Sequence, residues 1–373
     1  MSVKTGEYSG DAWYTAAGKD DDVVLSSKVS LVRNLANFPF PSRLSPSEDE
    51  HIQAIVLDSF NRMDNAADFH TVKISSLDPN GFKIMCERGI LCETDSRGAL
   101  ILRNDGRLSC TVNTGDHVVL SSFSSGSDME SVADFLSGID SKLQESIQFA
   151  ASCDFGYLNS SIFDSGSGMK LSFTFHLPCL TFSGKIPSLV RDVEADKLSL
   201  KGLFGAGGAT VVSFSGGSGS SLGFYYTLET ASSTGGSEME QLLNIVSWAK
   251  RITDIERTER SDSAARMNAY MKNFIQRSTA LSKASLFLSF REAVEIISAV
   301  KLGKDTGLLD GIENSALHAL LYRIQDGHLG YVLKNGRFDF EKDVSSEAQR
   351  IQWLRSMTLR ETFEGISSPG LSL

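Results

Sequence analysis

From Ser237 to Leu302 the chain reads SEMEQLLNIVSWAKRITDIERTERSDSAARMNAYMKNFIQRSTALSKASLFLSFREAVEIISAVKL, with neither glycine nor proline. Glycine and proline are the residues that most often punctuate strands and end helices, so their absence over this length predicts helices. Before Ser237, glycine and serine are frequent and short apolar runs alternate with them. We therefore place an α+β domain at residues 1–240 and a helical domain at residues 241–373.

Local signals support helices in the second half. Two S-x-x-E sequences, Ser237 to Glu240 and Ser289 to Glu292, match the capping box that satisfies free N–H groups in a first helical turn. Apolar residues then recur at helical spacing on one face: Leu242, Ile245, Val246, Ala249, Ile252 and Ile255, and later Leu317, Leu320, Leu321 and Ile324. The mostly charged stretch 255–267 is expected to be a solvated helix face.

The first half carries strand signals. Residues 100–102 and 108–112 flank Asn104-Asp105-Gly106-Arg107, whose Asp-Gly pair is typical of a hairpin turn. Residues 171–177 alternate apolar and polar side chains, which predicts a strand with one buried face. Hairpins and alternation favour an antiparallel sheet that keeps one face available for a site. The Ser/Gly-rich segment 213–237 is expected to be a mobile loop or a hairpin with loose tips.

Composition excludes several classes of protein. The 373 residues are 41% apolar and carry a net charge of −10, which argues against a nucleic-acid or anionic-membrane partner. The start of the sequence lacks an apolar segment typical of secretion signals, and no long apolar run predicts a membrane span. Five cysteines without a C-x-x-C pair indicate free thiols in a reducing cytoplasm.

Common catalytic motifs are missing from the sequence. It contains no G-x-x-x-x-G-K-[ST] phosphate loop, no dinucleotide fingerprint, no H-E-x-x-H and no G-x-S-x-G. The six histidines show no metal-ligand spacing, so we predict no metal site. These patterns alone lead no further than a cytoplasmic α+β protein with a helical C-terminal domain.

Several ordered motifs extend this interpretation. A series of short motifs follows along the chain. They lie at residues 26–35 with 38–41, 113–118, 156–158 with 166–170, 172–178, 201–207, and 291–303 with 307–309. In this order they resemble the motifs of bacterial protein-arginine kinases of the McsB type, within the ATP:guanidino phosphotransferase (phosphagen kinase) superfamily. The resemblance covers nearly the whole chain and implies an antiparallel sheet flanked by helices, followed by a helical C-terminal domain.

The resemblance also implies a reaction. The family transfers the γ-phosphoryl group of ATP to a guanidinium nitrogen, which in protein-arginine kinases belongs to an arginine of a protein. Arginines clamp the phosphates in bidentate fashion, and Mg²⁺ bridges them. Carboxylates align and deprotonate the guanidinium, because a group with a pKa above ~12 is otherwise no nucleophile.

This sequence departs from the family at those functional positions. Thr114 and Gly115 replace the two glutamates of the family's NEED motif, and Ala206 replaces the glutamate of RGxYGEG. Ser161 stands where the family has the cysteine of CPTN. We therefore predict that no catalytic residue of the family is retained.

The phosphate clamp is altered as well. The family's arginines align with Lys28, Ser30, Val119, Lys170 and Lys201. Lysine keeps the charge but loses the planar fork of arginine. We take as nucleotide-phosphate candidates Lys28, Ser30, His117, Lys170 and Lys201. No resident cofactor is predicted, and Mg-ATP is the expected ligand only if nucleotide binding is retained. Asp116 and His117 are expected to orient a strand end.

The family's receptor pocket for phosphorylated arginine aligns with residues 346–351, where its first arginine is altered. Arg350 and Arg355 are expected to be surface residues of a helix, and Trp353 to lie in a core or an interface.

Three functional hypotheses remain open. The first is a pseudo-kinase that regulates or scaffolds bacterial protein quality control. By analogy its partners would be an McsA-like activator, Clp machinery, or a second copy bound through the helical domain. The second is a divergent active ATP:guanidino kinase that uses relocated acids, with Asp95, Glu93 or Asp164 as candidates. The third is an anion or nucleotide sensor without turnover, acting through Lys28, Lys170 and Lys201.

Overall fold

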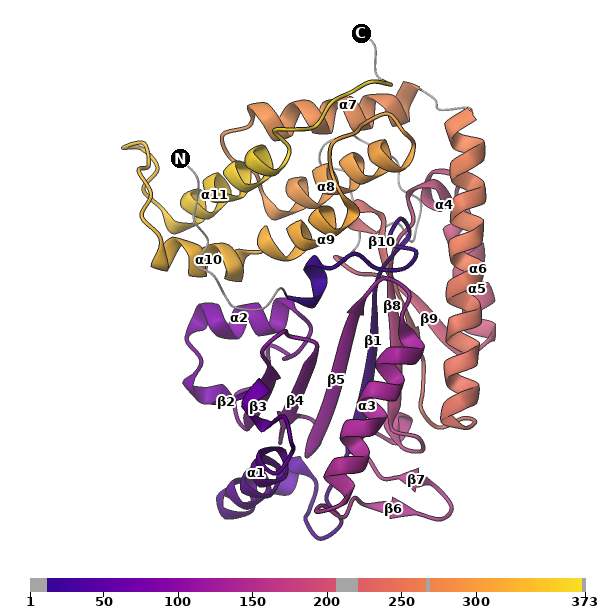
Figure 1. Ribbon diagram of the computed structural model, residues 1–373, viewed down its shortest axis with the longest axis vertical. Coiled ribbons are helices and arrows are strands. Elements are labelled where there is room, and N and C mark those ends of the chain that lie inside the picture. The colour runs from indigo at the N-terminus through magenta and orange to yellow at the C-terminus, as the bar shows by residue number, and fades with distance from the viewer. Residues whose placement is uncertain (1–11, 206–220, 266–268, 371–373) are drawn as a thin grey trace.

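The computed structural model describes residues 12–205, 221–265 and 269–370. Its centre is an eight-stranded antiparallel sheet with the strand order β2-β3-β4-β5-β1-β8-β10-β9 (Figure 1). The strands of this sheet are β1 (Val24–Arg33), β2 (Phe69–Lys73), β3 (Ala99–Arg103), β4 (Leu108–Val112), β5 (Val118–Ser125), β8 (Met169–His176), β9 (Leu198–Gly202) and β10 (Tyr225–Thr230). Strands β6 (Ala151–Ser152) and β7 (Gly156–Tyr157) form a separate two-stranded sheet.

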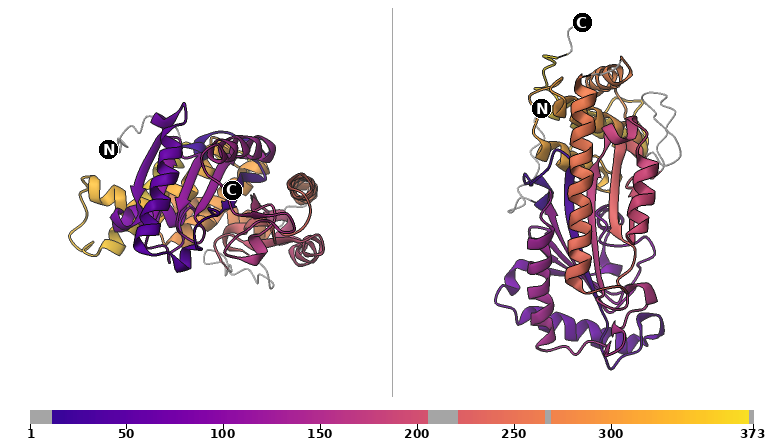
Figure 2. Two further views of the ribbon diagram at one scale, coloured as in Figure 1. Left: turned by 90° about the horizontal axis from the view of Figure 1, so that it is seen from below. Right: turned by 90° about the vertical axis from the view of Figure 1, so that its right-hand side faces the viewer.

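Helices cover one face of the large sheet. Its apolar side chains, such as Val29 and Leu31, form one core with helices α1 (Pro46–Asn61), α3 (Met129–Gln144), α4 (Pro178–Phe182), α5 (Ile186–Ala195) and α6 (Glu238–Ala265). Figure 2 shows α6 running along the sheet toward the helical region. Because α6 contributes Ile245, Trp248 and Ile252 to the core under the sheet, it is the element that joins the two halves of the chain.

A second core lies among the C-terminal helices. These are α7 (Ala269–Ala284), α8 (Phe290–Asp305), α9 (Asn314–Arg323), α10 (Asp326–Asn335) and α11 (Glu347–Thr362). Helix α8 is at its centre, since residues 293–303 of α8 are all buried. Helix α2 (Pro79–Glu87) contacts α10, where Glu87 accepts a hydrogen bond from the Gly327 N–H at 2.8 Å. The placement of a domain boundary near residue 240 stays a prediction.

Most local predictions are confirmed. Strands β3 and β4 pair around the Asn104–Arg107 turn, in which Gly106 has a φ of +69° that favours glycine. Both predicted capping boxes form, with Glu240 and Glu292 accepting from the N–H groups of Ser237 and Ser289. The stretch without glycine or proline forms α6, α7 and most of α8. The expected fold class, an antiparallel sheet with flanking helices and a helical C-terminal region, is confirmed.

Of the two expectations for 213–237, a mobile loop is wrong for residues 225–230, whereas a hairpin agrees with the antiparallel pairing of β10 with β9. Residues 225–230 form β10, which pairs with β8 on one side and β9 on the other. Tyr225, Tyr226 and Leu228 are fully buried, so tertiary packing overrides a composition that suggested a loop. Residues 213–220 lie outside the described residues.

The charged stretch 255–267 is not simply a solvated face. Glu256 is 0% exposed, and its carboxylate accepts hydrogen bonds from the N–H groups of Cys179 and Leu180, both at 2.9 Å. Arg257 and Arg260 reach back to the start of β1 and bind the carboxylate of Asp22. The partners of these charged residues come from segments far away in the chain, so the local sequence does not reveal them.

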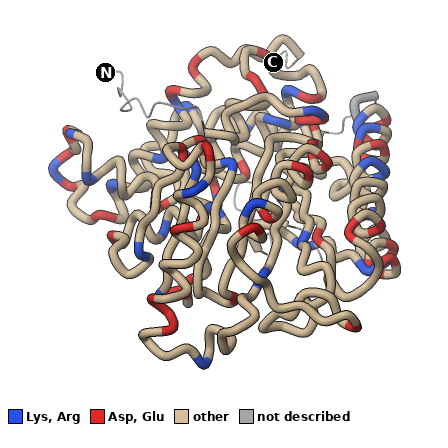
Figure 3. The backbone as a smooth tube through the Cα atoms, turned by 60° about the horizontal axis from the view of Figure 1, so that its bottom comes forward, with Lys and Arg blue, Asp and Glu red and all other residues tan. Residues whose placement is uncertain are grey.

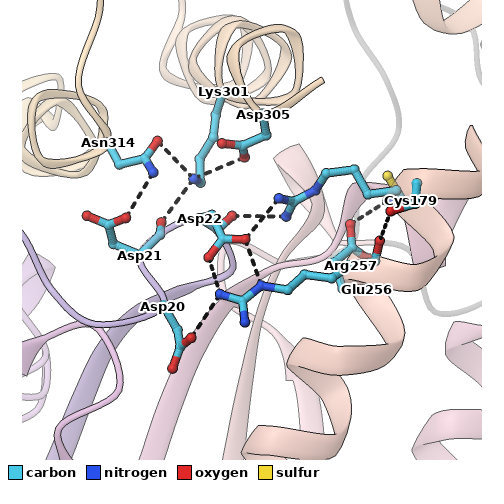
Figure 4. Close-up of polar contacts among 11 residues, drawn as sticks. Asp20, Asp21, Asp22, Cys179, Glu256, Arg257, Lys301, Asp305 and Asn314 are labelled. Atoms are coloured by element: carbon cyan, nitrogen blue, oxygen red, sulfur yellow. Dashed lines mark hydrogen bonds and ion pairs between the residues drawn. The ribbon is translucent and has the colours of Figure 1, made fainter. Parts of the chain in front are cut away.

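Residues Asp20–Asp22, here called the acidic turn, connect the sheet to the helices (Figure 4). Arg257 donates to Asp20 at 2.8 Å, and Arg260 donates to Asp22 at 2.9 Å. Burial by itself would raise the pKa of Asp22, but these two arginines lower it overall. From α8, the buried Lys301 donates to the Asp21 carbonyl at 3.0 Å, so the turn is held from both sides.

Charge is distributed over the whole chain. Figure 3 shows acidic and basic residues interspersed along the described backbone, with both signs on α6. Among the described helices, none is both long and apolar enough to cross a membrane.

The burial of Glu256 predicts a pH-dependent stability. Desolvation raises the pKa of its carboxyl from 4.5 to about 7, so the folded state holds the proton more tightly than the unfolded state. This contribution to stability is complete below pH 4.5 and is lost as the pH rises through 7, by about 3 kcal/mol in total. The side chain of the Glu256→Gln variant does not titrate. The unfolding free energy of this variant should therefore rise relative to that of the wild type as the pH increases from 4.5 through 7. Urea unfolding of both proteins at several pH values measures the difference, and parallel profiles would contradict it.

Candidate active site

The three lysines predicted from the sequence share one face of the sheet. Lys28 lies on β1, Lys170 on β8 and Lys201 on β9. Side chains alternate along a strand, and Val29 and Leu31 point into the core under the helices, so Lys28 and Ser30 point to the opposite face. In the β1–β8 register, Lys170 lies directly opposite Ser30, and Lys28 lies directly opposite Ser172. The register therefore brings the predicted phosphate positions together on the face away from α3 and α6.

Hydroxyl groups line the space between these lysines. Ser30 and Ser121, on neighbouring strands β1 and β5, hydrogen-bond through their hydroxyls at 2.7 Å. Ser172 follows on β8, where it is opposite Lys28 on one side and Glu229 on the other. The face thus combines ammonium groups, hydroxyls and one acid that the sequence did not suggest.

Lys28 is held by the chain. Its ammonium donates to the carbonyl of Gly89, just after α2, at 3.0 Å, and lies 5.1 Å from the centre of the Phe123 ring. The side chain is half-buried, and burial lowers its pKa; nearby Lys170 lowers it further, while Glu229 and Cys92 oppose the shift. Lys28 therefore contributes a partly desolvated cation to the polar face.

The other two lysines already have acidic partners. Lys170 forms an ion pair with Asp164 at 2.8 Å, and Lys201 pairs with Glu229 at 3.6 Å. Asp164 ends the short turn η5 (Ile162–Asp164). Glu229 lies on β10, two residues after Thr227, which is opposite Lys201 of β9. Both pairs are partly exposed, so each is worth no more than about 1 kcal/mol. An incoming anion would nevertheless have to displace a carboxylate from two of the three lysines.

Asp116 and His117 hold the end of β1. The Asp116 carboxylate accepts from the Asn34 amide and from the Ser160 N–H, both at 2.7 Å. His117 Nδ1 accepts from the Leu35 N–H at 3.0 Å, so Nε2 carries the proton and donates to the Pro39 carbonyl at 2.9 Å. Burial lowers the pKa of His117, which keeps the ring neutral. These contacts agree with a structural role, and they leave neither ring nitrogen open for a phosphate.

The replaced family positions carry no acid in the described residues. Thr114 hydrogen-bonds to the Thr111 hydroxyl at 3.1 Å. Gly115 faces open space, because a Cβ added there would meet nothing within 4 Å. Ser161 precedes η5 and is half-buried, and Ala206 lies outside the described residues. The backbone at position 115 thus leaves room for the β-carbon of a larger residue.

The three acids considered as replacements differ in position. Asp95 accepts from the Cys92 N–H at 2.8 Å within its own turn, and Glu93 is exposed in that turn. Asp164 does reach the polar face, through Lys170. Sequence reasoning missed Glu229, whose place beside Lys201 depends on the register of β9 against β10. That register follows a connection of about twenty residues, and no local signal fixes it.

The expectation that Arg355 is a surface residue is wrong. Arg355 is 1% exposed, donates to the carbonyls of Ile324 and Leu288 at 2.7 and 2.9 Å, and pairs with Asp326. Its guanidinium thus ties α11 to the ends of two other segments, because charged donors can satisfy carbonyls that apolar neighbours cannot.

The neighbouring side chains of α11 form a small aromatic cluster. Arg350 and Trp353 are half-buried, and both pack on the ring of Phe340, at 5.3 and 5.1 Å. Trp353 thus makes an edge-on packing contact within the helical region.

Neither a metal site nor a triphosphate site with magnesium matches this face. Across residues 12–205, 221–265 and 269–370, no group of three His, Cys, Asp or Glu side chains is arranged to hold a metal ion. The three lysines at the clamp positions offer point charges without the bidentate fork of arginine. Two of them, Lys170 and Lys201, are already paired with acids. The residues present do not fit the Mg-ATP that the resemblance implies.

Comparison with known proteins decides the family. The model of the ATP:guanido phosphotransferase C-terminal catalytic domain matches residues 51–259, more than half of the chain. The chain belongs to the ATP:guanido phosphotransferase family. The remaining helical part, residues 268–372, matches the C-terminal domain of the protein-arginine kinase McsB. The ATP:guanido phosphotransferase match spans most of the sheet, and the McsB match spans α7 to α11.

Relatives of this ATP:guanido phosphotransferase homologue include protein-arginine kinases. The protein-arginine kinase of Clostridium acetobutylicum is 25% identical over 94% of this chain and 98% of its own length. That of Halothermothrix orenii is 26% identical over 85% of this chain and 88% of its own. The chain is thus an McsB-like homologue of protein-arginine kinases over nearly its full length.

Solved structures agree on the fold. Lombricine kinase superposes with a TM-score of 0.54 at 15% identity, over 69% of this chain and 71% of its own. The duplicated taurocyamine kinase of Schistosoma mansoni, with bound transition-state analogue components, gives 0.56 at 14% identity over 75% of this chain and 41% of that chain. At such identity these likenesses establish the guanidino-kinase fold alone.

Removal of the two acidic partners should strengthen anion binding. In Asp164→Asn/Glu229→Gln, Lys170 and Lys201 lose their competing carboxylates, so inorganic pyrophosphate should bind about tenfold more tightly than to the wild type. Isothermal titration calorimetry measures both dissociation constants. Adding Lys170→Ala to the double variant should reverse most of the gain, whereas an unchanged affinity in the double variant would show that the ion pairs do not limit access.

Proposed function

We propose that this McsB-like chain is a pseudo-kinase, which keeps the fold of a protein-arginine kinase, lacks phosphoryl transfer, and acts in the cytoplasm as a regulatory or scaffolding protein of bacterial protein quality control. One observation carries the proposal. The two acids on the polar face, Asp164 and Glu229, are bound to lysines at the phosphate-clamp positions. Both of these acids are therefore already paired with lysines of the same face.

The guanidinium side of the reaction lacks what it needs. A guanidinium has a pKa above ~12 and becomes a nucleophile only when a carboxylate aligns it and takes its proton. Among the described residues, the family positions for this task hold Thr114 and Gly115, and Ser161 stands at the family's cysteine position. Loss of such groups lowers rates by several decades, and the remaining contacts of a site do not restore them.

The phosphate side is weakened in the same direction. Each charge-assisted hydrogen bond lost with an arginine costs about 1.5–3 kcal/mol of phosphate affinity. Two losses of this size move a dissociation constant by about two to four decades. Ser30 and Val119 have no charge at all, and the paired lysines would have to exchange one anion for another.

Two alternatives each have one observation in their favour. An active divergent kinase would use Asp164, which is three residues from the family's cysteine position and reaches the polar face. An anion or nucleotide sensor without turnover would act through Lys28, Lys170 and Lys201. The Lys28 ammonium donates to a carbonyl oxygen, and among the described residues no acid lies within ion-pair distance of it.

The proposed partners are proteins. By family analogy they are an McsA-like activator, Clp-type unfoldase machinery, or a second copy of the chain. The helical region leaves three large apolar side chains exposed, Tyr270, Leu286 and Phe287, which would suit a homodimer through that region.

A phosphorylation assay tests the pseudo-kinase proposal. We expect that purified protein, incubated with Mg²⁺, γ-labelled ATP and an arginine-rich protein, forms no acid-labile phosphoarginine above a no-enzyme blank. A McsB-type protein-arginine kinase from one of the relatives serves as the positive control. Phosphoarginine that appears with the wild type and vanishes with Asp164→Asn would replace the proposal with the active-kinase alternative.

A thermal-shift titration separates the sensor alternative. If Lys28, Lys170 and Lys201 no longer hold nucleotide, several millimolar Mg-ATP should leave the unfolding temperature unchanged, because a ligand stabilises a protein only in proportion to its occupancy. Inorganic sulfate at the same ionic strength controls for salt effects. A shift that is abolished by Lys28→Ala would favour the sensor.

A further inference from the structure

Strand β2 forms one edge of the eight-stranded sheet (Figure 1). Among the described strands, it pairs with β3 alone, in an antiparallel register. His70, Thr71 and Lys73 of this short strand are exposed. The outer edge of β2 is therefore accessible to a further strand, because the unpaired N–H and C=O groups of an edge strand can continue a sheet.

The hydrogen bonds to β3 show which backbone groups point outward. Just before β2, the Asp68 carbonyl accepts from the Asn104 N–H at 2.9 Å. In an antiparallel pair, residues that bond to the neighbouring strand alternate with residues that do not. The even-numbered residues of β2 therefore face β3. The N–H and C=O groups of Phe69, Thr71 and Lys73 face away from the sheet.

Two of these outward groups are already used within the chain. The Phe69 N–H donates to the Ala66 carbonyl, and the Lys73 carbonyl accepts from the Ser76 hydroxyl at 2.7 Å. The other outward groups have no hydrogen-bond partner among the described residues. They are two donors, the N–H groups of Thr71 and Lys73, and two acceptors, the carbonyls of Phe69 and Thr71.

These free groups match those of a second copy of the same strand. When the second copy runs antiparallel with Thr71 opposite Thr71, Lys73 of each copy comes opposite Phe69 of the other. The two Thr71 residues then exchange two hydrogen bonds, and each Lys73 N–H donates to a Phe69 carbonyl. The groups already used, the Phe69 N–H and the Lys73 carbonyl, also come opposite each other. The pairing therefore leaves no free donor or acceptor on either edge.

The side chains agree with this arrangement. Phe69 packs edge-on against Phe60 of α1, with ring centres 5.2 Å apart, so Phe69 and Lys73 share the face toward α1. Opposite residues of an antiparallel pair point to the same face, so each Lys73 would lie beside a Phe69 ring, a contact that favours a cation. On the other face, His70 would come opposite Val72. No two like charges are directly opposite each other, which would be destabilising.

We propose that two copies of this chain pair through the outer edges of β2 and join their sheets into one antiparallel sheet across a two-fold axis. The matched groups favour a second copy over an unrelated extended segment, whose own N–H and C=O groups would meet the occupied Lys73 carbonyl and Phe69 N–H. Each copy contributes a strand of five residues, so the contact is small and the dimer is reversible, forming at about micromolar or higher concentration. The inference is independent of phosphoryl transfer.

Sedimentation velocity over a range of protein concentrations tests the pairing. The wild type should shift from monomer to dimer as its concentration rises. Thr71→Pro removes an outward N–H, which β3 does not use, and proline is tolerated at such positions of edge strands. It should raise the dimer dissociation constant about tenfold or more. The matched control Thr71→Val keeps the N–H and the β-branched shape, and should change the constant less than about twofold. Circular dichroism checks that both variants fold.

The other outcomes are equally clear. A wild type that stays monomeric at every concentration, or a dimer that Thr71→Pro leaves unchanged, would overturn the proposal. A dimer that is lost in Tyr270→Ser/Leu286→Ser/Phe287→Ser and kept in Thr71→Pro would belong to the helical region instead.

A cysteine at position 71 tests the register without a proline. Opposite residues that exchange hydrogen bonds have Cα atoms about 5.5 Å apart, which a disulfide can span. In a Cys92→Ser/Cys153→Ser background, which removes the exposed thiols, Thr71→Cys should form an intermolecular disulfide in oxidised glutathione. Ser141→Cys, exposed on α3, should form far less. Equal cross-linking of both would overturn the proposed register, and neither result bears on the phosphoarginine assay.

Discussion

The arrangement of the whole chain depends on the acidic turn between the sheet and the helices. Asp22 receives hydrogen bonds from Arg257 and Arg260 of α6, while the Asp21 carbonyl receives one from Lys301 of α8. Lys301 is buried and also pairs with Asp305 at 3.2 Å, so its charge is compensated inside the protein. Buried charges are costly unless they are paired and hydrogen-bonded, and this requirement fixes the start of β1 against both helices.

The position of β1 in turn determines the polar face. Strand β1 lies between β5 and β8, so Ser30 is opposite Ser121 of β5 on one side and Lys170 of β8 on the other. Lys28 is opposite Ser172 of β8. The family's scaffold is thus preserved around an altered set of side chains. Asp116 and His117 hold the end of β1 through hydrogen bonds to Asn34 and to the Leu35 N–H, and these contacts give both residues a structural purpose.

Sequence reasoning succeeded where the signal was local. The Asn104–Arg107 hairpin, the two capping boxes and the alternation in β8 each depend on residues within a few positions of one another. It failed where partners are distant. Arg355 looked like a surface residue until its carbonyl partners from residues 288 and 324 were in place, and Glu256 looked solvated until the start of α4 covered it. For the site, the shared face of the three lysines followed from the family resemblance, but their acidic partners did not.

Backbone propensity, capping and periodicity are properties of neighbouring residues, so the amino-acid order alone established the helices, the antiparallel strands and the replacement of the family's glutamates and arginines. Electrostatic pairing is a property of distance in space. Only the folded chain brought Asp164 to Lys170 and Glu229 to Lys201. Contacts of this kind join segments separated by tens of residues, and strand register and packing decide them.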